Sequence, residues 1–300
     1  MKLKSAWSLL KSVFSSWSAD YAPSMGAALA YYTMFSIAPL LLIVISVAGL
    51  FFGEEAARGE IFHQLEGLMG AEGAQAVQGL LENANKPKQG VAGTIVGFVL
   101  LLVGATTVFG ELQSDLDRIW RAPEREKTSG IWGLLRTRLL SFGMILGLGF
   151  LMMVSLVFSA ALAALSNWWN PVFGGWEAVA HLVNQLVSFG FTTAVFAMIY
   201  KFMPHVKIEW HDVWVGALVT AFLFTVGKFL ISLYIGKAGV SSSFGAAGSL
   251  VILLVWVYYS AQIFLLGAEF TWIYSHTHGS RMDEPTPAEL TPLRKAPEST

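Results

Sequence analysis

Six apolar stretches constrain this chain of 300 residues more than any other feature of its sequence. They lie at about residues 28–52, 91–112, 139–165, 179–203, 213–235 and 246–273. Each is at least about 20 residues long, the length that an α-helix needs to cross about 30 Å of hydrocarbon. The sequence therefore predicts an all-α fold, a polytopic membrane helical bundle with six transmembrane helices.

The composition agrees with a membrane protein and excludes several functional classes. Hydrophobic residues make up 55% of the chain and charged residues 13%, about half the charged share of soluble domains. A net charge of −1 gives no basic excess for a nucleic-acid partner. The absence of cysteine excludes disulfides, thiolate metal sites and cysteine nucleophiles. The first stretch is too long for the core of a signal peptide, so we expect it to remain as the first span.

The distribution of lysine and arginine predicts the orientation, because loops rich in these residues stay in the cytoplasm. Fourteen of the 19 Lys and Arg residues fall in the N-terminal segment, in the loops after the second and fourth stretches, and in the C-terminal tail. The opposite loops hold four. We therefore expect a multi-pass protein of the bacterial inner membrane with both termini in the cytoplasm.

Three segments are expected outside the spans. Residues 1–20 carry an apolar stripe at helical spacing, formed by Leu3, Trp7, Leu10, Phe14 and Trp17. This pattern favours a cytoplasmic interfacial helix over a short helix packed under the bundle. Within the transmembrane domain 21–275, residues 53–90 predict an external amphipathic helical hairpin turning near Gly70 and Gly73, although a simple packed loop also fits. The proline-containing tail 276–300 is expected to be disordered.

Three motifs, in order along the chain, resemble a known bacterial family. They are Ala27–Tyr32 leading to Pro39-Leu40, the segment Glu111–Trp120, and Phe244–Ser249 followed by Leu254–Tyr259 and Gly267-Ala268-Glu269. Together they are similar to the YihY/virulence factor BrkB family of inner-membrane proteins, formerly called ribonuclease-BN-like. The resemblance covers most of residues 20–275 and implies a six-helix integral membrane protein without supplying a mechanism. Asp117 and Phe244 depart from the family, which usually has Asn and Tyr there.

Ionisable groups inside apolar spans are costly, so each one is a candidate functional residue. Lys228 in the fifth stretch lies about 10 Å below its outer boundary, and His181, Asn184, Gln185 and Ser188 in the fourth start at about the same depth. Together they predict a pocket for an anionic headgroup. Snorkelling of the lysine and helix–helix hydrogen bonding of the amides remain alternatives.

A second polar layer is predicted at the cytoplasmic end. Glu111 ends the second stretch and Glu269 lies near the end of the sixth, where Arg118, Arg121 or Lys201 could pair with either acid. An ion pair that holds this face shut is the preferred interpretation, with proton coupling as the alternative. Pro39 removes one backbone donor within the first span and predicts a kink there.

No motif supports an enzyme, a metal site or a cofactor. His276-x-His278 lacks the Asp-His partners of a metal-dependent nuclease, and no nucleotide-binding loop is present. The expected partners are membrane lipids, including an anionic lipid or lipopolysaccharide-type substrate, and a homo-oligomer remains open. The leading hypothesis is a transporter or flippase-like handler of an anionic envelope amphiphile. The alternative is a non-transporting scaffold for envelope biogenesis.

Overall fold

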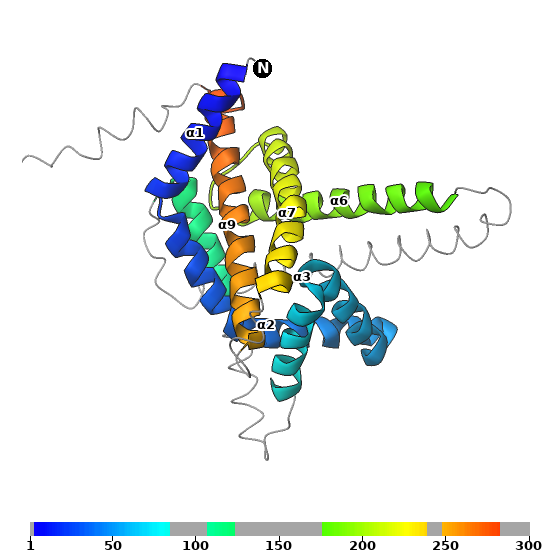
Figure 1. Cartoon of the computed structure of the whole chain (residues 1–300). Coiled ribbons are helices and arrows are strands. Elements are labelled where there is room, and N and C mark those ends of the chain that lie inside the picture. Colours follow the sequence, from blue (N-terminus) through cyan, green and yellow to red (C-terminus); the bar gives the residue numbers. More distant parts are fainter. Residues whose placement is uncertain (1–2, 85–106, 124–175, 239–247, 283–300) are drawn as a thin grey trace, which may run out of the picture.

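The computed structural model describes residues 3–84, 107–123, 176–238 and 248–282, and it contains no strand in these ranges. Its labelled helices are α1 (Leu3–Ala19), α2 (Ala22–Phe52), α3 (Glu54–Ala84), α6 (Trp176–Phe202), α7 (Trp210–Ala238) and α9 (Gly248–Thr277). Residues 107–119 are also helical. The all-α prediction is confirmed for this part of the chain (Figure 1).

Three described helices are long and apolar enough to cross a membrane: Gln185–Phe202, Trp210–Ile231 and Leu250–Thr277. They correspond to the fourth, fifth and sixth predicted spans. The two halves of α2 would make a fourth span, and they meet at 42° on either side of Pro39, the position where the sequence predicts a kink. The second predicted span, apart from residues 107–112, and the whole third span lie outside the described residues.

Helices α7 and α9 run side by side in opposite directions at the centre of the molecule (Figure 1). Glycines allow their close approach, because Thr271 of α9 lies over Gly216 of α7 and Thr220 of α7 lies over Gly267 of α9. The buried Tyr200 hydroxyl of α6 donates to the Phe264 carbonyl at 2.8 Å, which ties α6 to the same interface. The largest apolar core surrounds these contacts.

Helix α3 occupies the region for which the sequence predicts two short helices. The structure has one continuous helical run there, with no loop at Gly70 and Gly73. The run folds back on itself, because Ile61 and Leu81 pack in one cluster around Ile45 of α2. In a straight helix these two residues would lie about 30 Å apart. The segment therefore folds back as a bent helix that packs on α2 and α9, and its external position stays a prediction.

Helix α1 packs on α9 through Leu9 and Val13, and it leaves Trp7 and Phe14 of the predicted stripe exposed. The expected helix is therefore present, while its place in the headgroup layer stays a prediction. At the other terminus, ordered structure continues to Met282, further than the sequence predicts, because residues 278–282 turn back onto the start of α7.

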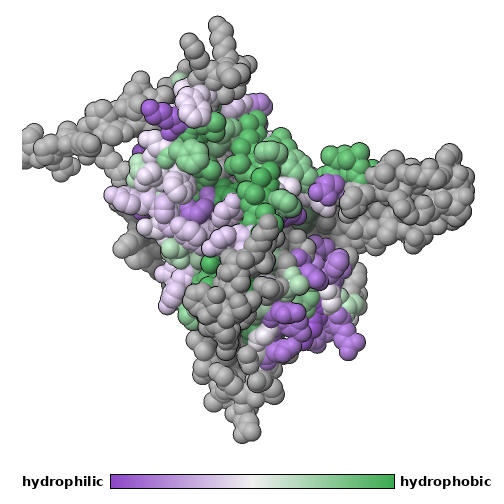
Figure 2. All heavy atoms as spheres, in the orientation of Figure 1, coloured by the Kyte–Doolittle hydropathy of each residue, from purple (hydrophilic) through white to green (hydrophobic). Residues whose placement is uncertain are grey.

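The surface separates by polarity (Figure 2). Hydrophobic residues gather over the region of α7, whereas hydrophilic residues gather over α3. The exposed apolar side chains of α7 include Leu218, Phe222, Val226, Phe229, Leu230 and Leu233. Exposed apolar side chains at helical spacing are what a lipid-facing helix requires, since the hydrocarbon takes the place of a packed neighbour.

Candidate functional site

The structure describes the side chains of three residues of the predicted outer pocket, Gln185, Ser188 and Lys228. Gln185 and Ser188 are exposed on the N-terminal half of α6, which extends away from α7 in Figure 1. The contacts between α6 and α7 instead run through Phe196 and Tyr200, further along α6. The side chains of His181 and Asn184 lie outside the described residues. The pocket around Lys228 therefore stays a prediction.

Lys228 itself lies on the packed side of α7. It follows Ala221 and Phe224 at spacings of seven and four, which places it on the same helical face as these two residues. Ala221 is buried, and Phe224 packs its ring on Phe196 of α6 and Trp256 of α9. Within the described ranges, no carboxylate lies within ion-pairing distance of the half-buried Lys228 amine.

The structure does assemble a polar site around Glu269, which is 0% exposed within the longest of the described helices that could cross a membrane. The groups that act on its carboxyl are Asp20 and Ser16, from α1 and the turn after it, and Arg121. We call Asp20, Arg121 and Glu269 the charge triad. Arg121 is one of the cations that the sequence offers as a partner for Glu269, and the ion pair that holds this face shut stays a prediction.

Geometry fixes the arginine of the charge triad between an acid and an aromatic ring. The Arg121 guanidinium lies 3.7 Å from Asp20 Oδ2 and 4.6 Å from the ring centroid of Trp272. Asp20 is only 7% exposed. Neither oxygen of Glu269 is in a hydrogen bond of good geometry among the described residues. A buried carboxyl without such bonds is costly, and such groups concentrate at functional sites.

Asp20 was missed by the sequence analysis, although a signal for it exists. Leu9, Val13, Ser16 and Asp20 recur at spacings of four, three and four, which puts them on one face of α1. All four are buried, and this face packs on α9. The aromatic stripe of the same helix is the stronger hydrophobic signal, and it concealed the stripe that ends in the acid.

Two further residues of the predicted cytoplasmic polar layer, Glu111 and Arg118, lie outside the charge triad. Glu111 is half-buried and has no ion pair within the described ranges, and it lies near Asp115 on the same helical face. Arg118 is exposed, and its guanidinium lies 5.6 Å from the ring centroid of Tyr21. The predicted pairing of Glu111 with a cation is therefore not seen.

Helical residues 107–119 are clamped to the loop between α6 and α7. The Gln113 side chain donates to the Met203 carbonyl at 2.8 Å. The Asp117 carboxylate accepts the His205 backbone N–H at 2.7 Å and lies 2.6 Å from His205 Nδ1. Asp117, one of the two departures from the family pattern, thus has a structural role in this chain, as it fixes the segment that carries Arg121.

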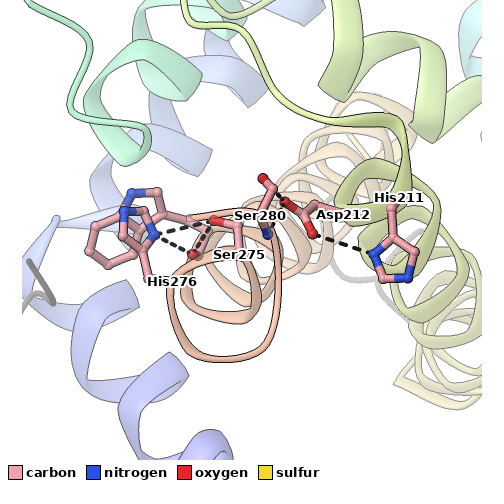
Figure 3. Close-up of polar contacts among 6 residues, drawn as sticks. His211, Asp212, Ser275, His276 and Ser280 are labelled. Carbon is pink, nitrogen blue, oxygen red and sulfur yellow. Dashed lines mark hydrogen bonds and ion pairs between the residues drawn. The ribbon is translucent and has the colours of Figure 1, made fainter. Parts of the chain in front are cut away.

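A second polar junction joins the end of α9 to the start of α7 (Figure 3). Asp212 is fully buried, and its Oδ2 accepts the Ser280 hydroxyl at 2.6 Å and the Ser280 N–H at 3.2 Å. His211 Nδ1 lies 3.6 Å from the other carboxylate oxygen. A Cβ at Gly279 would lie 2.2 Å from Asp212 Oδ1, so only glycine fits there. This junction holds the end of the bundle rigid.

Four cationic side chains at this end of the bundle each lie over an aromatic ring. The pairs are Arg118–Tyr21, Arg121–Trp272, Lys201–Trp210 and Arg281–Trp120, with 4.6 to 5.6 Å between charge and centroid. We call them the cation–aromatic pairs. Tyr21 and Trp210 are themselves exposed. Cations beside exposed aromatic rings are typical of the headgroup layer of a membrane.

Burial raises the pKa of Asp115, which lies beyond the end of the predicted second span, from 3.8 to about 7. Glu111 raises it further by repulsion, and Arg118 opposes the shift. The native state therefore holds a proton that the unfolded state releases above about pH 4. The free energy of unfolding should fall as the pH rises from about 4 to about 7, by at most about 4 kcal/mol.

Asp115→Asn tests this dependence. Because the amide never ionises, the variant should show a flatter pH dependence of its thermal unfolding midpoint between pH 5 and 8 than the wild type. It should also be the more stable of the two at pH 8. The exposed Glu66→Gln on α3 is the control and should keep the wild-type slope. A wild-type slope in Asp115→Asn would contradict the burial of an ionisable carboxyl at this position.

Comparison with known proteins places the chain. The family model described as virulence factor BrkB matches residues 13–291, nearly the whole chain. The chain belongs to the virulence factor BrkB family. A UPF0761 membrane protein of Psychromonas ingrahamii is 30% identical over 81% of this chain and 79% of its own length. One from Aeromonas salmonicida is 26% identical over 81% of this chain and 80% of its own length.

Other members of the virulence factor BrkB family are longer. A UPF0761 membrane protein of Pseudomonas paraeruginosa is 29% identical over 83% of this chain but only 58% of its own length. No solved structure matches. Membership and the apolar helices together identify a membrane protein of this family, and the names of these relatives assign no activity.

Proposed function

We propose that this member of the virulence factor BrkB family is a transporter-like handler of an anionic lipid or similar envelope amphiphile, and that it catalyses no covalent reaction. The observation that supports this most is the set of cation–aromatic pairs at one end of the bundle. A phosphate headgroup would meet Arg118 and Lys201 there, while the exposed rings of Tyr21 and Trp210 would lie at the level of the interface.

The charge triad adds a reason to favour transport over passive binding. Glu269 lies within a membrane-spanning helix, and ionisable residues at such depth are expensive to bury. Structural packing between helices does not need a carboxyl, because α7 and α9 already fit closely through glycine and threonine. Buried acids near a route for charged groups are typical of transport proteins.

Movement of fluorescent lipids between the leaflets of proteoliposomes tests the proposal. The wild type should move labelled phosphatidylglycerol faster than labelled phosphatidylcholine. Arg118→Gln should slow the anionic lipid by about tenfold, since a charge-assisted contact is worth about 1.5 kcal/mol. Arg58→Gln on α3, where the arginine pairs with Glu54 four residues away, is the matched control. It should leave the rate unchanged.

Transport at the rate of protein-free liposomes for both lipids would contradict the proposal and favour the scaffold alternative. The same assay tests the outer-pocket hypothesis through Lys228→Met. A loss of anionic selectivity in that variant would support a headgroup site on the packed face of α7. An unchanged rate would leave Arg118 and its neighbours as the headgroup contacts.

A further inference from the structure

Glu269 occupies a buried site with few polar neighbours. It is 0% exposed, and the side chains of Ser16 and Asp20 lie beside its carboxyl, although neither carboxyl oxygen is in a hydrogen bond of good geometry among the described residues. Asp20 faces it from the turn after α1, Ser16 from α1 itself, and Arg121 from the end of the clamped segment. No other ionisable group within the described ranges acts on this carboxyl.

The charges of this site do not balance. With both acids ionised and Arg121 cationic, the charge triad carries one uncompensated negative charge in an apolar surrounding. Arg121 cannot compensate both acids, because its guanidinium lies against Asp20 and the Trp272 ring. One more positive charge would neutralise the site, and two carboxyls that face each other can share a single proton.

We propose that the Asp20–Glu269 carboxyl pair binds one proton, and that this proton holds α1 against α9. The proton comes from the water at this end of the bundle and returns to it, so no other reactant is needed. This inference deepens the proposed function by naming the ion that would drive or regulate it. The binding of the proton does not depend on lipid transport.

The backbone around the charge triad is suited to a change of position. Tyr21 and Arg121 are the only described non-glycine residues with left-handed φ, at 59° and 51°. Such conformations are uncommon outside glycine, and they cluster at hinges and functional sites. Tyr21 directly follows Asp20 and separates α1 from α2. Loss of the proton would leave two facing carboxylates, whose repulsion would turn α1 away from α9 about Tyr21.

The natural absence of cysteine makes a direct distance measurement simple. Spin labels are attached at Ser12→Cys on α1 and at His278→Cys after α9, both of which are exposed positions. Double electron–electron resonance then measures the distance between the two labels. The wild-type background should give one short distance at pH 5 and a longer population at pH 8. Glu269→Gln, which mimics the protonated acid, should keep the short distance at both pH values.

Two further variants and a proton titration test whether the response belongs to the Asp20–Glu269 pair. Asp20→Asn should also abolish the pH response, and it replaces Glu269→Gln if that variant does not fold. Glu66→Gln, an exposed acid on α3 outside the charge triad, should keep the response. Titration of the unlabelled protein in weak buffer should show one proton fewer per chain for Glu269→Gln than for the wild type.

Several outcomes would overturn the inference. A wild-type distance that does not change with pH would do so, and so would a pH response that persists in Glu269→Gln. A response that requires sodium instead of following pH in potassium buffer would assign the site to a metal cation. Because neither readout involves lipid movement, a protein that binds the proton but moves no lipid would contradict the proposed function alone.

Discussion

Arg121→Ala is expected to lower the free energy of unfolding by about 3 kcal/mol. The change removes the cation facing Asp20 and Glu269, and breaking a buried ion pair by removing one partner costs about 3 to 5 kcal/mol. The lower end applies because the arginine side chain is 30% exposed. Thermal or denaturant unfolding in detergent, followed by circular dichroism, measures the loss.

Arg118→Ala is the matched control, since it removes an exposed arginine one turn earlier on the same segment. It should cost less than about 1 kcal/mol, the usual worth of an exposed charge contact. The double variant Arg121→Ala with Glu269→Gln should recover part of the lost free energy of unfolding. One of the two acids left without the arginine is then neutral. Equal losses for the two arginine variants would contradict the triad.

Gly267→Ala is expected to destabilise the protein by about 2 kcal/mol, within the range for overpacked cores. An added Cβ would lie 2.0 Å from Thr220 Oγ1 and 2.7 Å from the Tyr200 hydroxyl oxygen. Three helices meet at this point, so relief would require α7 or α6 to move away from α9. The thermal unfolding midpoint in detergent measures the effect.

Gly190→Ala on α6 is the control for helix propensity, because nothing lies within 4 Å of its added Cβ. That variant should be neutral or more stable by up to about 1 kcal/mol, since alanine is the better helix former. Thr220→Ala in the Gly267→Ala background should recover part of the stability by removing the closest atom. No difference between the two glycine variants would mean that α7 and α9 are not in close contact at Gly267.

The sequence predicted the described spans because hydrophobicity and length are local properties. Long apolar runs gave α6, α7 and α9, and Pro39 gave the position of the bend in α2. The same local reasoning placed a turn between two helices at Gly70 and Gly73, where the structure has a helix that folds back without a loop. A helix can bend without breaking when packing against neighbours, here around Ile45, favours the bend.

The glycines that matter were also not identified from local pattern. Gly26, Gly216, Gly227 and Gly267 each lie where an added Cβ would collide with a side chain of another helix. The sequence of a single helix carries no signal that distinguishes a glycine approached by a neighbouring helix from one that is not. Helix pairing decides which glycines are needed, and pairing is not encoded in the spacing of one helix.

The six apolar stretches thus indicated that the chain lies in a membrane and that its spans are about 20 residues or longer. They also indicated that ionisable residues within these spans are the candidate functional residues. The tertiary structure decided which ionisable groups meet. It left Lys228 without an ion-pairing acid among the described residues, and it joined Asp20 and Arg121 to Glu269 across three distant segments. The physical reason is that the free-energy cost of burying an ionisable side chain depends on the type of that residue, which the sequence gives. The partner groups that offset this cost depend on which helices pack together.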